Sequence, residues 1–530
     1  MPENNQHGIA KLFENYSEVV EPTEAKVEGK IPSWLNVTLL RNGPGIFKIG
    51  NYEFNHWFDG LAFMQRYYFH EGKMYYSARY LESESYKMDM AENRIVIGEF
   101  GTASFRDPCK GLLGKLQTVF AEEPMTDNAS VNFFALGDSV WAVTETPRII
   151  RIDPATLSTL DRYDMRDTIA MHTFTAHQHY DSENNVYSIG SKFGKSTEYI
   201  FTVTKNPKNT NKSLTDALGE TSIIAQIPAS ESFYPTYYHS FGMTENYLIL
   251  FESPLRLDMK KLIIRKIQNI PFKETMIWRD NCPVIVRVID KRNGKEIKMK
   301  FRHEGFFAFH QANAFEKDGC IITEYCAMER AGDLSQFDLK VIRSEGLGEI
   351  QDKKEAAFCC RMIIPLDFDL KNVKEGQDLL EGKNFARGCR AVLKNKDEIW
   401  LQHEQLSEYA FEFPQINRRQ NLKPHRFVYG SDINWNRGTK ACVIKVDTET
   451  KKTIIWNRDH KEQFAGEPIF VQTPGSKDED DGVILVPILN FSDTDTPFVL
   501  VLDAKTFTEV ARCRVDHRLP PGFHSQVYGN

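Results

Sequence analysis

The sequence has little that would anchor it in a membrane or send it to another compartment. Its 530 residues contain no run of about 18 apolar residues, which a membrane-spanning helix requires. The first residues, MPENNQHGIAKLFENYSEVVEP, lack the basic start and apolar stretch of a secretory signal. They also contain too many glutamates for a mitochondrial transit peptide. We therefore expect a cytoplasmic protein.

Positive charge and paired cysteines are also scarce. The formal net charge is −7, whereas nucleic-acid-binding domains are usually basic, so we expect no nucleic-acid partner. The nine cysteines include no CxxC pair, and the adjacent Cys359 and Cys360 are poorly placed to bridge. This usage indicates reduced thiols in the cytosol.

Three common catalytic signatures are absent. The sequence contains no GxxxxGK[ST], no HExxH and no GxSxG. Phosphate-binding loops, zinc proteases of the HExxH type and α/β-hydrolases therefore find no support. Any chemistry must come from residues that are dispersed along the chain.

Short strands dominate what is present. The segments DSVWAVTE, NYLILFES, GCIITEY, DGVILVPIL and TPFVLVLDA are rich in β-branched and aromatic residues and are bounded by turn-forming residues. Clear helical stretches are few. The pattern predicts an all-β protein with inserted helices and loops.

One local pattern recurs: an apolar strand, an aspartate, a tight turn and a second strand. It occurs at Asp153, Asp290, Asp447 and Asp503. The last two are separated by about one four-stranded propeller blade of roughly 40–50 residues. We expect a β-propeller whose chain ends meet to close the ring, and an all-β sandwich is the alternative. No low-complexity linker divides the chain, so we expect residues 1–530 to form one domain.

Four of the fourteen histidines lie in apolar or aromatic surroundings: His177, His239, His310 and His524. A single histidine of this kind is more often a hydrogen-bonded core residue than a ligand. Four of them on separate predicted blades are different, because inner strands of a propeller converge on one axis. Imidazole ligands suit Zn, Cu, Fe and Ni. The sequence therefore predicts an axial metal site.

Acidic residues in apolar stretches are candidates for holding these histidines. Glu145, Glu412 and Glu467 lie among aromatic and aliphatic residues, where an unpaired carboxylate is costly. A metal-binding histidine normally donates its other N–H to such a group. A hydrogen bond to the backbone is the alternative for each glutamate. Spacing alone does not choose between His177 and His179, because residues two apart on a strand share one side.

These residues belong to a longer series of matches. The sequence resembles the animal carotenoid cleavage oxygenases, a family that includes the β-carotene oxygenases and the retinoid isomerohydrolase of the retinal pigment epithelium, and it looks nearer to the β-carotene oxygenases. The matching segments run almost from end to end: LLRNGPG, NHWFDG, EFGT, DPCK, TDNASVN, YYHSFGMTENY, FHQANAFEKDGC, FEFPQIN, EPIFV, DEDDGVIL, LDAKTFTEVAR and GFH.

The resemblance implies a seven-bladed propeller with a helical and loop cap over one face and one axial non-haem Fe(II) per chain. The implied iron ligands are His177, His239, His310 and His524, with Glu145, Glu412 and Glu467 anchoring three of them. It selects His177 over His179. One departure is Gln178, where the family often has proline; this change removes no ligand. The histidine near the C-terminus would then pin the tail.

The resemblance also implies the reaction. We expect a dioxygenase that cleaves a conjugated C=C bond of a carotenoid with O2 and gives apocarotenoid or retinoid carbonyl products. Two alternatives remain open: a retinoid isomerohydrolase acting on retinyl esters without O2, and an iron-containing protein that binds carotenoid without cleaving it. Dependence on oxygen separates the first two.

A carotenoid substrate resides in membranes, so we expect peripheral contact with a membrane surface. Two amphipathic stretches that contain lysines fit this role, and the implied contact residues are Leu112, Leu113, Leu116, Phe120, Leu262 and Ile263. A basic amphipathic helix lies well on an anionic interface. The alternative is that each stretch is a buried amphipathic helix.

Overall fold

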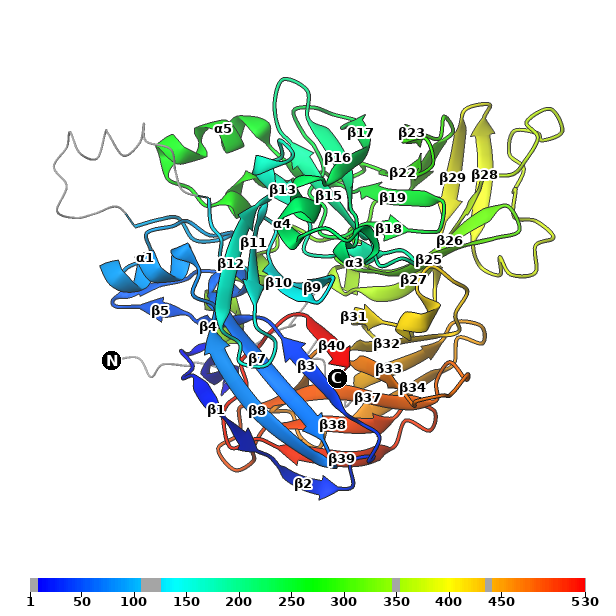
Figure 1. Ribbon diagram of the computed structural model, residues 1–530. Helices are drawn as coiled ribbons and strands as arrows, with labels where there is room; N and C mark the ends of the chain where they lie inside the picture. The colour runs from blue at the N-terminus through cyan, green and yellow to red at the C-terminus, as the bar shows by residue number, and fades with distance from the viewer. Residues whose placement is uncertain (1–7, 106–124, 346–352, 434–440, 530) are drawn as a thin grey trace.

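The computed structural model describes residues 8–105, 125–345, 353–433 and 441–529 (Figure 1). Its regular elements are mostly strands, as the sequence predicts, and neighbouring strands are nearly all antiparallel. Among the described residues, no helix is both long and apolar enough to cross a membrane.

The recurring aspartates end strands in tight turns. The Asp447 side chain accepts hydrogen bonds from the backbone N–H groups of Glu449 and Thr450, at 2.9 and 3.1 Å. Lys451 then adopts a left-handed conformation, with φ of 60°, which reverses the chain. Such turns between an aspartate side chain and the following backbone explain why this residue type recurs there. Asp153 and Asp503 form the same turn, and Asp290 bonds to the N–H of Arg292.

The two ends of the chain share two sheets, as expected for a closed ring. The first has the order β1 (Val19–Glu24), β8 (Lys73–Tyr80), β7 (Leu61–His70), β3 (Val37–Arg41) and β40 (Ser525–Gly529), with β4 (Pro44–Ile46) beside β7. The second has the order β2 (Lys26–Gly29), β39 (Glu509–Arg514), β38 (Phe498–Asp503), β37 (Gly482–Asn490) and β35 (Gln463–Ala465), with β36 (Ile469–Gln472) beside β37. Figure 1 shows β40, near the C-terminus, beside β3.

The other larger sheets are built from strands that are close in sequence. One contains β9 (Asn132–Leu136), β10 (Ser139–Val143), β11 (Arg148–Ile152) and β12 (Thr159–Asp164). The next contains β13 (Thr173–Phe174), β14 (His179–Tyr180), β15 (Val186–Lys192), β16 (Glu198–Thr204) and β17 (Ser222–Pro228). Two further sheets contain β25 (Gln311–Lys317), β26 (Cys320–Ala327), β27 (Phe358–Pro365) and β30 (Glu404–Gln405), and β31 (Glu412–Gln415), β32 (Phe427–Ser431), β33 (Ala441–Asp447) and β34 (Thr453–Asn457).

The widest sheet departs from this local pairing. It contains β18 (Gly242–Met243), β19 (Tyr247–Glu252), β22 (Val284–Asp290), β23 (Lys295–Glu296), β24 (Lys300–His303), β29 (Glu398–Gln402) and β28 (Arg390–Asn395). Strand β24 pairs in parallel with β29, which adds a hairpin from a distant part of the chain. The fold is an all-β propeller, as expected, and its larger sheets contain between four and seven strands. The sheets are unequal because strands distant in sequence join them.

Helices are short and lie outside the sheets. They are α1 (Glu84–Glu92), α3 (Pro207–Thr210), α4 (Leu214–Gly219), α5 (Met259–Gln268) and α6 (Leu339–Glu345), and two-stranded ribbons are formed by β5 (Lys48–Ile49) with β6 (Tyr52–Glu53) and by β20 (Leu255–Leu257) with β21 (Met276–Trp278). Helix α5 begins at an Asp258 side chain that accepts hydrogen bonds from the first backbone N–H groups, and it ends at Asn269 in the left-handed conformation.

Candidate metal centre

Four histidines that are far apart in sequence meet in one cluster. One ring nitrogen from each of His177, His239, His310 and His524 lies within 4.8 Å of the others. They come from four different sheets. His310 and His524 directly precede β25 and β40, His239 precedes β18, and His177 precedes β14. Convergence of segments from four sheets therefore brings together the side chains that the sequence predicts.

Three of the imidazoles are hydrogen-bonded to carboxylates. The contacts are His239 Nδ1 to Glu145 Oε1 at 2.6 Å, His310 Nδ1 to Glu412 Oε2 at 2.6 Å and His524 Nδ1 to Glu467 Oε1 at 3.0 Å. When Nδ1–H donates to the carboxylate, the lone pair is left on Nε2. The Nε2 atoms face one another: those of His310 and His524 are 3.2 Å apart.

His177 is held differently. Its Nε2 lies 2.8 Å from His239 Nε2, but among the described residues no carboxylate contacts its ring. Its backbone N–H donates to Thr175 Oγ1 at 3.0 Å, and the Thr175 hydroxyl donates to the His239 carbonyl at 2.9 Å. The Gln178 side chain donates to the Thr175 carbonyl at 2.6 Å. Local backbone contacts thus fix this fourth histidine.

His179, the other candidate that spacing allows, has a structural role. Its Nε2 lies 2.7 Å from the Phe241 carbonyl, and its ring is outside the cluster. Burial lowers its pKa to about 4, so the ring is neutral and donates to that carbonyl. The structure therefore places His177, and not His179, with the other three.

The environment favours the neutral form of two of the clustered imidazoles, those of His310 and His177. Burial lowers the pKa of His310 to about 4, although the Glu412 carboxylate acts in the opposite direction. Burial, with the nearby rings of His524 and His239, lowers the pKa of His177 well below its ordinary value. A neutral imidazole is the form that binds a metal. An all-imidazole set with its outer nitrogens hydrogen-bonded suits a transition metal such as Fe, Zn, Cu or Ni.

Two contacts around the carboxylates were missed by sequence reasoning. The Tyr237 hydroxyl donates to Glu145 at 2.9 Å, and Gln415 Nε2 donates to Glu467 at 2.8 Å. Tyr237 stands two residues before His239, so the sequence could have indicated that both side chains lie on the same side of the chain. It could not indicate the contact with Glu145, which is remote in sequence. These bonds hold the carboxylate oxygens that in turn hold the imidazoles.

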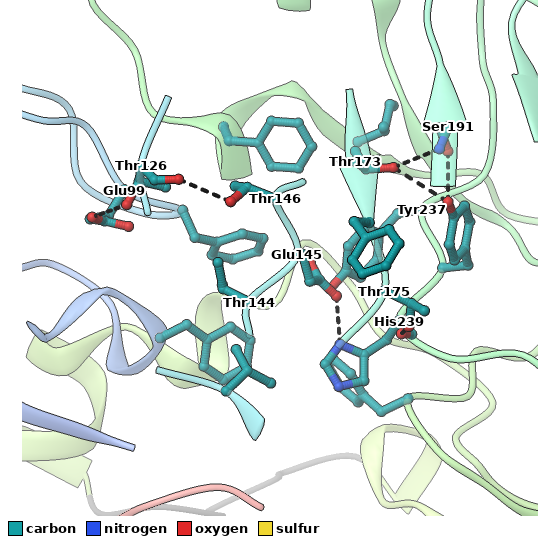
Figure 2. A pocket seen from close by; sticks show the side chains of 18 of the residues that line it. Glu99, Thr126, Thr144, Glu145, Thr146, Thr173, Thr175, Ser191, Tyr237 and His239 are labelled. Atoms are coloured by element: carbon teal, nitrogen blue, oxygen red, sulfur yellow. Dashed lines mark hydrogen bonds and ion pairs between the residues drawn. The ribbon is translucent and has the colours of Figure 1, made fainter. Parts of the chain in front are cut away.

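A cavity of about 590 Å³ opens beside the cluster. Its wall includes His239, His310 and His524 and many aromatic side chains: Trp57, Phe58, Phe100, Tyr237, Tyr238, Phe309, Phe337, Phe413 and Phe523. Figure 2 shows the Glu145–His239 pair on this wall with aromatic rings above it. The cavity can hold an apolar molecule beside the imidazoles.

Two of the six residues expected to contact a membrane line the cavity. Leu262 and Ile263 of α5 line it, and Ile263 is 72% exposed. The remaining four candidates, Leu112, Leu113, Leu116 and Phe120, lie outside the described residues.

Comparison with known proteins gives consistent matches over nearly the whole chain. The human β,β-carotene 15,15'-dioxygenase is 37% identical over 514 residues, covering 95% of this chain and 91% of the relative. The mitochondrial carotenoid-cleaving dioxygenase of Pongo abelii is 35% identical and covers 97% and 94%. A crystal structure of the cobalt-substituted Synechocystis apocarotenoid oxygenase superposes with a TM-score of 0.77 at 21% identity, covering 99% and 98%.

The family assignment follows from the extent of these matches. Residues 12–526 match the family described as retinal pigment epithelial membrane protein, a span that includes all four clustered histidines and their three carboxylates. The chain belongs to this family, the carotenoid oxygenases.

Proposed function

We propose that this protein is a non-haem Fe(II) dioxygenase that cleaves a conjugated C=C bond of a carotenoid with O2 and releases apocarotenoid or retinoid carbonyl products. The observation that carries the proposal is a cluster of four convergent imidazoles, three of which line an aromatic cavity of about 590 Å³. The names of the relatives, which are dioxygenases acting on carotenoids, support the substrate class.

One iron per chain fits the donor set. The Nε2 atoms of the four histidines would hold it, and Fe(II), when bound, supplies the centre at which O2 is activated beside the substrate. The protein's own residues do the rest. Glu145, Glu412 and Glu467 keep the proton on Nδ1 of their histidines, so that Nε2 stays free. The aromatic wall positions the polyene and excludes water.

The helix α5 side of the cavity is the proposed entrance, at a membrane surface. Helix α5 and its flanking loops would act as a cap there. Ile263 and Ile267 are 72% and 66% exposed, and Lys260 and Lys261 lie on the same helix. Exposed aliphatic residues with lysines are typical of helices that lie on anionic interfaces. Flotation with anionic vesicles tests this, and loss of binding in an Ile263→Glu/Ile267→Glu variant is expected.

We also propose a cytoplasmic location and a single domain over residues 1–530. The eight cysteines of the described residues are free thiols, which is typical of a reducing compartment. Strands from both chain ends share two sheets, which supports one folding unit. Cell fractionation tests the first proposal, and a single cooperative unfolding transition tests the second.

Aerobic turnover is the decisive test of the reaction. Iron-loaded protein is incubated with β-carotene or a xanthophyll in detergent, with and without oxygen, and products are identified by mass spectrometry after labelling with ¹⁸O2. We expect carbonyl products that require O2 and that are absent from a His310→Ala variant. Turnover of a retinyl ester without O2 would instead establish an isomerohydrolase, and retention of intact carotenoid would establish a binding protein.

A further inference from the structure

A second polar group faces the same cavity, away from the histidines. Figure 2 shows Glu99, Thr126 and Thr146 on one side and the Glu145–His239 pair on the other, with aromatic rings between them. Nothing in the proposed chemistry at the histidines uses Glu99. An acidic residue in an aromatic wall is costly unless it has a partner, so its purpose needs an explanation.

The two oxygens of the Glu99 carboxyl group differ in their contacts to the described residues. Glu99 is 7% exposed, and its Oε1 accepts a hydrogen bond from the Thr126 hydroxyl at 2.7 Å. The Thr126 hydroxyl is itself fixed, because it accepts from the Asn128 backbone N–H at 3.0 Å. Within the part of the chain that the structure describes, no hydrogen bond to Oε2 is found. Glu99 lines the cavity, so a ligand bound there can contact its carboxyl group.

The backbone around Glu99 is held rigidly. The Glu99 N–H donates to the Thr102 carbonyl at 2.8 Å. The buried Asp59 carboxyl accepts from the Gly101 N–H at 2.8 Å and from the Thr102 hydroxyl at 2.5 Å. On the other side, the Phe100 carbonyl accepts from the Lys273 N–H at 2.7 Å. A polar group fixed in this way before the ligand arrives is the arrangement that gives specificity.

The surroundings of Glu99 favour the neutral form of its carboxyl group. Burial raises the pKa of Glu99 well above its usual value, and the nearby acids Asp59, Asp89 and Asp127 raise it further, against the Thr126 hydrogen bond. A carboxylic acid kept neutral by its site has an O–H to donate as well as oxygens that accept. It can therefore pair with either a hydroxyl or a carbonyl oxygen of a ligand.

We propose that Glu99 recognises an oxygen atom, as a hydroxyl or keto group, on an end of the polyene, so that oxygenated carotenoids are preferred to hydrocarbon ones. This inference rests on the proposed function for the polyene that occupies the cavity. A hydrocarbon end group would shield the Glu99 carboxyl group from water and form no hydrogen bond with it. An oxygenated end group would form that hydrogen bond. Sites built to hydrogen-bond a substrate hydroxyl discriminate strongly against the analogue that lacks it.

Binding without turnover tests the inference. Iron-loaded protein is kept anaerobic, and quenching of tryptophan fluorescence measures the affinity for a dihydroxylated polyene and for its hydrocarbon counterpart with the same number of double bonds. In Glu99→Leu, affinity for the hydroxylated polyene should fall about 10- to 100-fold, the effect of losing one buried hydrogen bond. Affinity for the hydrocarbon should not fall. Glu99→Gln, which has a similar size and retains a donor and an acceptor, should keep most of the preference.

Two results would overturn the inference. One is an equal loss for both polyenes in Glu99→Leu, which would give Glu99 a purely structural role. The other is equal affinity of the unaltered protein for both polyenes. Because the measurement needs no O2, selective binding that is lost in Glu99→Leu supports the inference even if aerobic cleavage fails, so its failure and that of the proposed function are distinguishable.

Discussion

The four clustered histidines fall into two classes, and the difference lies in what holds them. His239, His310 and His524 are each bonded to a glutamate from another sheet or its connecting loop. His177 depends on Thr175, two residues away in its own segment. Each of the three glutamate contacts therefore links two parts of the ring, whereas the fourth histidine is positioned locally. We infer that these three contacts also connect different sheets of the propeller.

Removal of the C-terminal link should have the largest effect. Deletion of residues 524–530 removes His524 and strand β40, which pairs with β3. We expect loss of iron binding together with a lower unfolding temperature, because a ligand and a closing strand disappear at once. Iron content by mass spectrometry and thermal unfolding measure the two effects.

His524→Ala is the matched control for this deletion. It keeps the pairing of β40 with β3, so it should lose iron but lower the unfolding temperature less than the deletion does. Full iron occupancy in the truncated protein would contradict the assignment of His524 as a ligand.

Weakening one anchored histidine should have the next largest effect. In Glu412→Gln the charged acceptor of the His310 N–H becomes a neutral amide of the same size. Partners of this kind typically contribute 10- to 100-fold to metal affinity, so we expect a loss of about that size. Competition with a chelator under anaerobic conditions measures it.

Glu316→Gln is a suitable control for this substitution. Glu316 accepts hydrogen bonds from Thr244 and Asn246 away from the cluster, so its change should leave metal affinity unaltered. Similar losses in both variants would mean that the effect of Glu412→Gln is a general one on stability and not on His310.

Weakening the locally held histidine should have a smaller effect. Thr175→Val removes the hydroxyl between the His177 N–H and the His239 carbonyl. The loss of neutral hydrogen bonds predicts an affinity lower by about 2- to 10-fold. The same chelator competition measures it, and Thr175→Ser, which retains the hydroxyl, should bind metal normally. A loss as large as that of Glu412→Gln would remove the distinction between the two classes.

The sequence predicts those features that depend on residues close to one another in the chain. The propeller fold follows from short apolar strands and aspartate turns, and the four histidines stand out because their neighbours are apolar. Features that depend on contacts between residues far apart in the sequence could not be predicted in this way. The parallel pairing of β24 with β29 made the blades unequal, and the Tyr237–Glu145 bond joins residues that are 92 positions apart. Glu99 belongs to the matched segment EFGT, but the sequence does not mark it as a cavity residue, because the cavity forms only when the chain folds.

The dependence of metal affinity on pH should be the smallest effect, and it separates the role of burial from that of the anchors. A proton competes with the metal for Nε2, so affinity falls as the pH drops toward the pKa of the metal-free histidine. Burial lowers the pKa of His310 to about 4 even though Glu412 raises it, and burial also lowers that of the unanchored His177. The His310 ring therefore stays neutral at pH 6, whereas exposed histidines with a pKa of about 6.5 would be mostly protonated there. We expect little change in chelator competition between pH 8 and pH 6. A tenfold loss of metal affinity between pH 7 and pH 6 would mean that the cluster is open to water. Metal binding would then depend on the glutamates that hold the imidazoles and not on burial.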